Sequence, residues 1–305
     1  MNQPLFHVEP LPANIACPLC GSREARQVLE VKDYHYSNEV FLLSDCIGCG
    51  FRRTQPQPSP ETIGRYYNAP DYFSHDASTG GTTAHLYRWV RTWSLGRKHK
   101  LIRRFQPGGR FLDMGCGTGE WLAFLSTRGY HVEGVEPGLR ARERAIQQFS
   151  LKVVPQLEQV HAREQFQGAS LWHVAEHLHD LQGSVKRLHS LLTPKGFLFI
   201  AVPARESWDM AHYGPYWAAW DVPRHLWHFR RQDMVRLLEV QGFKLIATRR
   251  MWFDAYYIAL LSERYLGRPA WLAWALACII GTWSNVVSAV SGRPTSSVLF
   301  IAQKA

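Results

Sequence analysis

Four of the six cysteines stand in two pairs whose spacing suits a metal site. The pairs are Cys17 and Cys20 in CPLCG, and Cys46 and Cys49 in CIGCG. Two C-x-x-C pairs supply four thiolates for a tetrahedral zinc ion, and the glycine after each pair eases the turn around the sulfurs. The segment between the pairs is predicted to form a hairpin. Reduced thiols without a metal are the alternative, but the pattern favours a structural zinc ribbon over residues 1–58.

A second group with metal-ligand chemistry lies in WHVAEHLHD, where His173, Glu176 and His177 spell H-x-x-E-H. One class of metallopeptidase binds zinc through this pattern. On a helix, the two histidines would share one face because they stand four residues apart. The surrounding sequence, however, predicts a strand followed by a turn rather than a long helix. The setting therefore argues against a peptidase.

Strands and helices alternate from Arg110 onward. The predicted strands are RFLDMG, YHVEGVE, LKVV, ASLWHV and FLFIAVP, and the predicted helices are EWLAFLSTRG, LRARERAIQQF and LQGSVKRLHSLL, with a turn at TPKG. This order predicts an α/β, Rossmann-like, doubly wound parallel sheet that binds its ligand at the carboxyl ends of the strands.

The first strand–helix turn, DMGCGTGE, contains Gly115, Gly117 and Gly119. Asp113 ends the first strand and Glu136 ends the second, where a carboxylate can accept hydrogen bonds from ribose hydroxyls. The dinucleotide pattern G-x-G-x-x-G fails because its sixth position is Glu120, which disfavours NAD. D-x-G-x-G-x-G followed by an acid resembles the class I S-adenosylmethionine (SAM)-dependent methyltransferases, from about Arg110 to the C-terminus.

The resemblance implies a seven-stranded sheet and a set of cofactor contacts. Asp113 and the glycine turn, Cys116 included, would hold the amino-acid part of SAM, and Glu136 would hold its ribose. Trp172 and His173 would lie at the mouth of the cofactor cleft, where this family places residues that touch SAM and substrate.

The H-x-x-E-H segment has two interpretations in this family. In the ubiquinone-biosynthesis O-methyltransferases, a similar E-x-x-E-H segment holds a divalent cation. Here His173, Glu176 and His177 match that frame with His in place of the first Glu, which would favour an ion softer than Mg²⁺. The favoured interpretation is instead a set of polar side chains that line the cleft, with His177 as a base.

The segment after the fifth strand is dense in aromatic residues and histidines. It contains DVPRHLWHF and is predicted to form a substrate lid over residues 204–230. It resembles bacterial methyltransferases that carry both a four-cysteine ribbon and DVPRHLxHF. His225 and His228 stand three apart, and His225 is a candidate base for the proton released during methyl transfer. The alternative is that His225 only holds the lid to the sheet.

An uncharged stretch over residues 269–292 lies within a predicted apolar helical insertion, 256–292. By length it could cross a bilayer, but the strand SSVLFIAQK after it must return to the sheet. Three interpretations stay open, namely a buried helical cap, a membrane-docking or lipid-substrate surface, and a membrane span. The cap is favoured.

The remaining features concern partners and location. The net charge of +10 permits an acidic partner, such as a phosphorylated metabolite, nucleic acid or an anionic membrane. No basic segment followed by an apolar one opens the chain, so we expect a cytoplasmic protein, with contact to the inner membrane face through residues 269–292. Residues 59–105 are predicted to be a linker and a helix whose basic side chains, Lys98 among them, cover the outer face. Residues 106–305 would form the SAM-binding domain.

Three functions follow from these patterns. The first is a SAM-dependent methyltransferase acting on a small molecule at a hydroxyl, an amine or a sugar carbon, in surface-polysaccharide or secondary-metabolite synthesis. Lipid-linked and phosphorylated acceptors are candidates. The second is an RNA methyltransferase, although the N/D-P-P-Y motif of base methylation is absent from the end of the fourth strand. The third is a non-enzymatic ribbon module on a SAM-domain scaffold.

Overall fold

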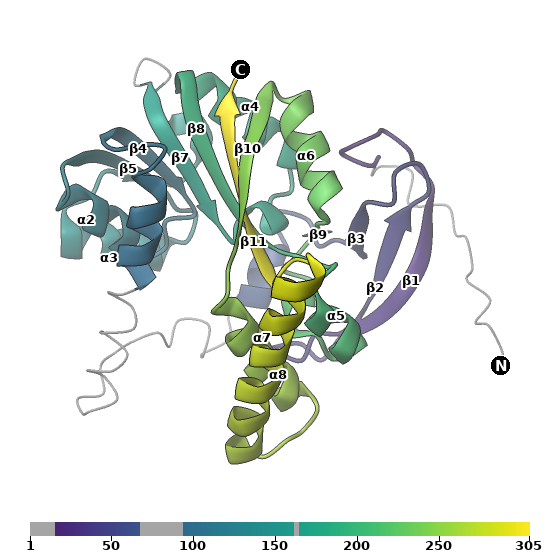
Figure 1. Ribbon diagram of the computed structural model, residues 1–305. Coiled ribbons are helices and arrows are strands. Elements are labelled where there is room, and N and C mark those ends of the chain that lie inside the picture. Colours follow the sequence, from purple (N-terminus) through teal and green to yellow (C-terminus); the bar gives the residue numbers. More distant parts are fainter. Residues whose placement is uncertain (1–15, 68–93, 162–164) are drawn as a thin grey trace, which may run out of the picture.

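The computed structural model describes residues 16–67, 94–161 and 165–305. They form two sheets, a large one flanked by helices and a small antiparallel one beside it (Figure 1). Two stretches lie outside the described residues, namely the N-terminal stretch before residue 16 and the first half of the predicted basic helix. Residues 94–102 are helical, as the sequence predicts.

The large sheet has seven strands in the order β10-β11-β8-β7-β4-β5-β6. Their bounds are β4 Gly109–Met114, β5 Tyr130–Val135, β6 Val153–Val154, β7 Phe166–Trp172, β8 Leu192–Pro203, β10 Phe243–Arg250 and β11 Ser297–Lys304. Within this sheet β11 runs antiparallel to both of its neighbours, and the other pairings are parallel. The predicted doubly wound α/β fold is confirmed.

Helices lie against this sheet and beyond its end. They are α2 Glu120–Ser126, α3 Leu139–Phe149, α4 Leu181–Leu191, α5 Trp208–Tyr213, α6 Arg231–Val240, α7 Asp254–Tyr265 and α8 Ala270–Ser291. Of these, α2, α3, α4 and α6 pack against the sheet, and α5, α7 and α8 lie beyond its end (Figure 1). The start of α4 shows why a helix begins there, since the Asp180 carboxylate accepts a hydrogen bond of 2.8 Å from the amide of Gly183. The sequence predicts a turn at TPKG between the helix and the next strand. That prediction is wrong, because β8 begins at Leu192 and includes these residues.

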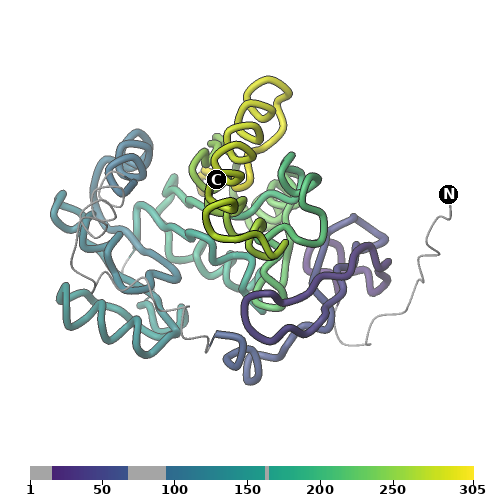
Figure 2. The backbone as a smooth tube through the Cα atoms, turned by 90° about the horizontal axis from the view of Figure 1, so that it is seen from below, coloured from purple at the N-terminus to yellow at the C-terminus, as the bar shows by residue number. Residues whose placement is uncertain are grey.

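The small sheet has the order β1-β2-β3-β9. Its strands are β1 Ala25–Lys32, β2 Val40–Cys46, β3 Arg52–Gln55 and β9 Trp227–His228. The first two form the predicted hairpin, but the fourth comes from the segment predicted to be the lid. Arg53 pairs with Trp227 and Arg52 with His228. Figure 2 shows this module and the β5–β6 edge of the large sheet at opposite ends of the molecule.

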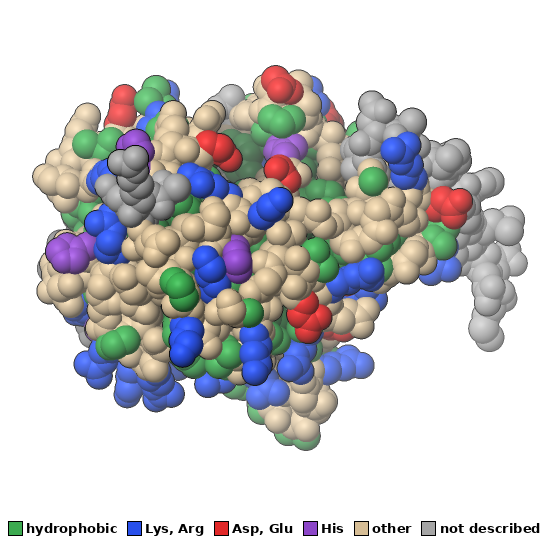
Figure 3. Space-filling model, turned by 90° about the horizontal axis from the view of Figure 1, so that it is seen from above, with side chains coloured by type: hydrophobic (Ala, Val, Ile, Leu, Met, Phe, Trp, Pro, Cys, Tyr) green, Lys and Arg blue, Asp and Glu red, His purple; other side chains and the backbone are tan. Residues whose placement is uncertain are grey.

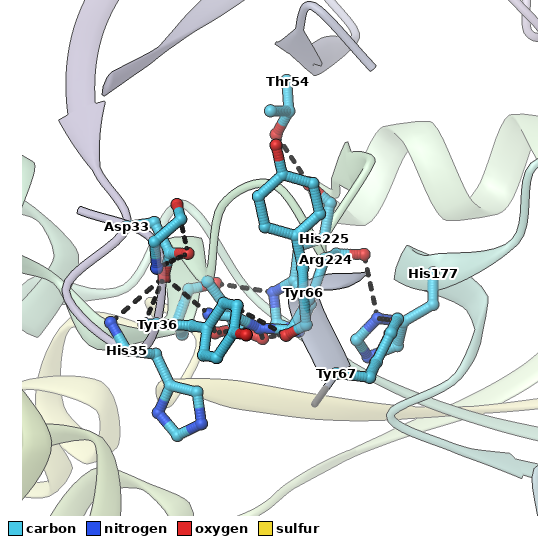
Figure 4. Close-up of polar contacts among 12 residues, drawn as sticks. Asp33, His35, Tyr36, Thr54, Tyr66, Tyr67, His177, Arg224 and His225 are labelled. Carbon is cyan, nitrogen blue, oxygen red and sulfur yellow. Dashed lines mark hydrogen bonds and ion pairs between the residues drawn. The ribbon is translucent and has the colours of Figure 1, made fainter. Parts of the chain in front are cut away.

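A buried ion cluster fastens the small sheet to the rest of the chain (Figure 4). Nη2 of Arg224 lies 3.0 Å from Oδ1 of Asp33 and 2.6 Å from Oδ1 of Asp221, and the Arg224 side chain is 1% exposed. Burial alone would raise the pKa of Asp33, but the charge of Arg224 and the hydrogen bonds from Ser37 lower it. Two segments far apart in sequence are thus joined by ionised groups away from water.

The helices α7 and α8 form a hairpin, residues 254–291, that projects from the body of the molecule (Figure 1). One stripe of α8 is buried and made of small residues, which let it approach its neighbours closely. These are Ala273, Ala277, Gly281, Ser284 and Ser288. Other faces are open, with Trp271 73% and Val290 84% exposed. By length and composition α8 could cross a membrane, and one third of its most apolar window is buried.

Candidate functional site

The glycine turn after β4 has the backbone geometry of a ligand cradle. Gly115, Gly117 and Gly119 all have positive φ, which favours glycine. A Cβ at Gly115 would lie 2.3 Å from the Val174 side chain, so that position is closed by packing. A Cβ at Gly117 would meet nothing within 4 Å, so space is open beside its backbone. The turn therefore presents an unobstructed backbone edge at the carboxyl end of the sheet.

The two acids expected at this edge flank the turn. The Asp113 carboxylate is buried and accepts a 2.5 Å hydrogen bond from the Ser170 hydroxyl. Burial raises the pKa of Asp113 to about 7, although Ser170 and the charge of Lys98 partly oppose it. The Glu136 carboxylate accepts hydrogen bonds of 2.8 Å from the amides of Gly117 and Gly138, and it keeps lone pairs for a ligand.

Cys116, in the same turn, turns its side chain away from this edge. Its sulfur would lie 2.6 Å from a Cβ at Gly134, and the side chain belongs to the apolar cluster of Leu122 and Leu151. Only the backbone of Cys116 can therefore face a cofactor.

A cavity of about 1400 Å³ lies beyond the end of β7. Trp172 and His173 line it, whereas Asp113, the glycine turn and Glu136 do not. Its lining also includes the apolar side chains of Met251, Trp252 and Phe253 from the segment that leads into α7. Because these residues precede the α7–α8 hairpin, the cavity lies at the base of that hairpin.

Lys98 was predicted on the exposed outer face of its helix, and this prediction is wrong. Its amino group lies 4.2 Å from the centre of the Trp172 ring, and the residue lines the cavity. A cation over an indole face is attractive, and the charges of Asp113 and Asp254 also favour the inward position. Helical periodicity cannot show this, since the aromatic partner lies more than seventy residues further along the chain.

His173 stands in the cavity between two carboxylates. Its Nε2 lies 3.1 Å from Oδ2 of Asp254, and its Nδ1 lies 3.4 Å from Oε1 of Glu176. Burial alone would lower the pKa of His173, but the two carboxylates raise it to about 10. The imidazole is therefore a cation at neutral pH. Its φ of 55° is uncommon for a residue with a side chain, and such geometry concentrates at functional sites. Sequence reasoning did not identify Asp254, which has no motif around it.

The histidines predicted as candidate bases lie together but away from the cavity. The ring centres of His177 and His225 are 4.6 Å apart, and neither residue is among those that line the cavity. Burial, together with the charge of His225, lowers the pKa of His177 to about 4. The predicted metal frame changes as well. Among the described residues, the group within 4.8 Å is Glu176, His177 and His225, without His173.

His228 takes a structural position. Its Nε2 lies 2.9 Å from the Thr54 hydroxyl, and burial lowers its pKa well below the usual range. It stands on β9 and holds that strand to β3 within the small sheet, and it is not among the residues that line the cavity.

The four paired cysteines converge at one end of the small sheet. Their ligand atoms all lie within 4.8 Å of one another, with Sγ–Sγ separations of 3.6 Å for Cys17 and Cys49 and 3.4 Å for Cys20 and Cys46. A tetrahedral zinc with Zn–S bonds of about 2.3 Å needs separations of about 3.8 Å. In each pair the glycine after the second cysteine donates its amide to the first cysteine's carbonyl, which closes the turn. The arrangement fits a zinc ion bound by four thiolates.

Comparison with known families adds one match. Residues 88–248 match the family model described as a methyltransferase domain, which covers more than half of the chain. The sequence matches no curated protein.

Several solved structures are similar to this chain. A SAM-dependent methyltransferase from Archaeoglobus fulgidus is 17% identical, covers 70% of this chain and 94% of its own, and has a TM-score of 0.48. A methyltransferase from Thermotoga maritima described as a possible histamine N-methyltransferase is 18% identical, with coverages of 72% and 96% and a TM-score of 0.48. The magnesium protoporphyrin IX methyltransferase from Synechocystis, solved with bound S-adenosylhomocysteine, is 13% identical, with coverages of 79% and 92% and a TM-score of 0.48.

Proposed function

The chain belongs to the methyltransferase domain family, and on that premise we propose that it transfers the methyl group of SAM to a small-molecule acceptor. The observation that carries the proposal is the open backbone edge at Gly117 between two acids at the ends of β4 and β5. SAM, when bound, supplies an activated methyl group. The protein's task is then to hold the acceptor nucleophile in line with that group and to exclude water.

Different residues would bind different parts of SAM and separate it from the acceptor. Asp113 would bind the ammonium of the SAM amino acid, and Glu136 would bind the ribose hydroxyls. The glycine turn would let the backbone approach the cofactor closely, while Trp172 and His173 would separate the cofactor from the cavity that receives the acceptor.

The cavity's charge supports an anionic acceptor. Its basic lining residues are Arg97, Lys98, Arg230, Arg231, Arg249, Arg250 and Arg293. The acids among the lining residues are Glu206 and Asp254, and Asp254 is paired with His173. A cleft with excess positive charge attracts phosphate or carboxylate groups. We therefore propose a phosphorylated or otherwise anionic acceptor, methylated at a hydroxyl, an amine or a sugar carbon, as in surface-polysaccharide or secondary-metabolite synthesis.

The position of the cavity favours a lipid-linked form of that acceptor. The exposed tryptophans of α8, Trp271, Trp274 and Trp283, belong to the hairpin whose base borders the cavity. Tryptophan is favoured at membrane interfaces, and an apolar face there binds the headgroup region. We propose that the hairpin docks on the cytoplasmic face of a membrane and places the cavity near lipid-linked substrate.

We also propose that the four paired cysteines bind one structural zinc ion.

Methylation of RNA is the less favoured alternative function. Lys and Arg side chains spread across the face in Figure 3 rather than forming one groove, as a nucleic-acid track would need. Binding of RNA with a steep salt dependence would favour that alternative instead.

Titration calorimetry with SAM and S-adenosylhomocysteine tests the cofactor assignment. The wild type should bind both, and Asp113→Ala or Glu136→Ala should weaken binding by about 1–3 kcal/mol, the scale of a lost hydrogen bond to a charged group. Glu143→Ala, an exposed acid on α3, is the matched control and should bind normally. A wild type that ignores SAM, or prefers NADH, would overturn the proposal. Methyl transfer to candidate phosphorylated sugars and lipids then identifies the acceptor.

A further inference from the structure

A small cluster of metal-ligating side chains lies between the two sheets, apart from the cysteines. Glu176 and His177 belong to the short 3-10 turn Ala175–His177 that follows β7, and His225 lies in the loop before β9. One ligand atom from each lies within 4.8 Å of the others. Figure 4 shows His177 and His225 beside Tyr67, Thr54 and Arg224.

Each histidine has one nitrogen held by a backbone carbonyl. Nδ1 of His177 lies 2.9 Å from the Arg224 carbonyl oxygen, and Nδ1 of His225 lies 2.9 Å from the Ala219 carbonyl oxygen. A carbonyl can only accept, so each Nδ1 is the donor and each neutral ring keeps a bare lone pair on Nε2. A carbonyl that holds the second nitrogen is the usual companion of a metal-bound histidine.

The third member is a carboxylate without a donor. The Glu176 side chain is 1% exposed, and neither of its oxygens has a hydrogen-bond partner among the described residues. Nδ1 of His173 lies 3.4 Å from Oε1, and Nε2 of His225 lies 3.9 Å from it. A carboxylate held away from water without hydrogen bonds is costly. The cationic His173 offsets part of that cost at Oε1, and a metal ion would supply the direct bonds that neither oxygen has among the described residues.

We propose that Glu176, His177 and His225 bind a divalent first-row transition metal ion such as Zn²⁺, Mn²⁺ or Fe²⁺. Two imidazoles and one carboxylate suit these ions, whereas a calcium or magnesium site would need more oxygen ligands. Asp221, 3.8 Å from His225, is held by Arg224 and is not counted as a ligand.

The ion would join the turn after β7 to the loop before β9, and hydrogen bonds connect both to the N-terminal segment. Glu176 and His177 follow a central strand of the large sheet, and the carbonyl of His225 accepts a 2.6 Å hydrogen bond from Thr54 on β3. The phenol of Tyr67 lies 3.0 Å from Nδ1 of His177. The proposal does not depend on SAM chemistry, because none of the three ligands lines the large cavity.

Titration of the metal-free full-length chain with Co²⁺ tests the site. The wild type should bind two ions, one with intense thiolate-to-metal absorption from the cysteine centre and one with only the weak bands of nitrogen and oxygen ligands. Glu176→Gln and His225→Ala should keep the thiolate band and lose the second ion. His179→Ala, two residues beyond His177, is the control and should bind two.

The outcomes separate a metal site from an ion pair. Binding of only one Co²⁺ by the wild type, in excess metal, would overturn the proposal and leave Glu176 paired with protonated histidines. A second ion that survives in both Glu176→Gln and His225→Ala would also overturn it. Because Gln keeps the volume of Glu, a thermal melt of Glu176→Gln shows whether loss of the ion or loss of folding explains the result.

Discussion

The two sheets of this protein are stabilised in different ways. The large sheet is buried between helices, and its central strands consist mainly of apolar side chains, such as Leu198, Phe199 and Ile200 on β8. The small sheet depends on a few specific groups, namely the cysteine cluster, the buried Arg224–Asp33 pair and the two-residue strand β9. In the large sheet the stabilisation from apolar burial is shared by many residues, whereas in the small sheet each of these groups contributes a large part of it. Substitutions should therefore damage the small sheet one residue at a time, while the large sheet should tolerate changes at its ligand-binding edge.

The largest effect is expected for Cys17→Ser. In small zinc domains the metal supplies on the order of 10 kcal/mol of folding free energy, so loss of one thiolate should unfold the small sheet and release its zinc. Zinc content and limited proteolysis measure this. Cys278→Ser, an exposed cysteine on α8, should leave both unchanged. Full zinc content and normal protease resistance in Cys17→Ser would show that the sheet does not depend on the cluster.

Arg224→Met should have the next largest effect. It leaves the buried Asp33 and the partly buried Asp221 without their cation, and breaking a buried pair on one side destabilises by about 3–5 kcal/mol. Urea unfolding measures the loss, with Arg231→Met, an exposed arginine on α6, as the control. A loss no larger than that of the control would mean that the pair does not fasten the small sheet.

The large sheet should lose function before stability, and the pH dependence of SAM binding tests this. Asp113 has a pKa of about 7 in the folded chain, above its usual 3.8. Its contribution to stability is therefore present in acid and is lost as pH rises towards 7. The ammonium of SAM should bind the ionised form, so affinity should rise by up to about tenfold per pH unit below 7.

Calorimetry at several pH values in Asp113→Asn provides the comparison. This variant should bind SAM weakly, with little dependence on pH. Its unfolding midpoint near neutrality should be at or above that of the wild type, because Asn has no charge to bury. A wild type whose affinity is flat between pH 5 and about 8 would show that Asp113 does not bind the ammonium.

The smallest effect on folding is expected in the α7–α8 hairpin, which belongs to neither sheet. Trp271→Ser should change the unfolding free energy by no more than about 0.5 kcal/mol, since the side chain is 73% exposed. It should still weaken sedimentation with anionic lipid vesicles by roughly tenfold, because an inserted tryptophan contributes about 1–3 kcal/mol. Val240→Ser, exposed on α6, is the control. Equal vesicle binding by all three proteins would argue against docking through the hairpin.

The sequence allowed the large sheet to be predicted because its signals are local. Each strand and helix is a continuous run, and Asp113, the glycine turn and Glu136 lie within 24 residues of one another. The structure confirms the doubly wound fold that these runs predict, and it confirms that residues 297–304 return to the sheet as β11.

The features that sequence could not supply depend on distant partners. Lys98 turns inward towards Trp172, His225 meets Glu176 rather than the cavity, and Arg224 pairs with Asp33. In each case the deciding neighbour is at least forty residues away, and periodicity carries no information about such a distance. A single sequence identifies which residues can do chemistry, but not which of them will meet.

The pairing of β3 with β9 also orders events during synthesis. Residues 52 and 53 leave the ribosome long before residues 227 and 228, with which they pair. Asp33 is likewise synthesised 191 residues before its partner Arg224. Most of the parallel sheet has been translated by then, whereas the four thiols of the N-terminal module have been exposed throughout. Early capture of a metal ion by those thiols would protect the nascent segment from oxidation until its last strand arrives.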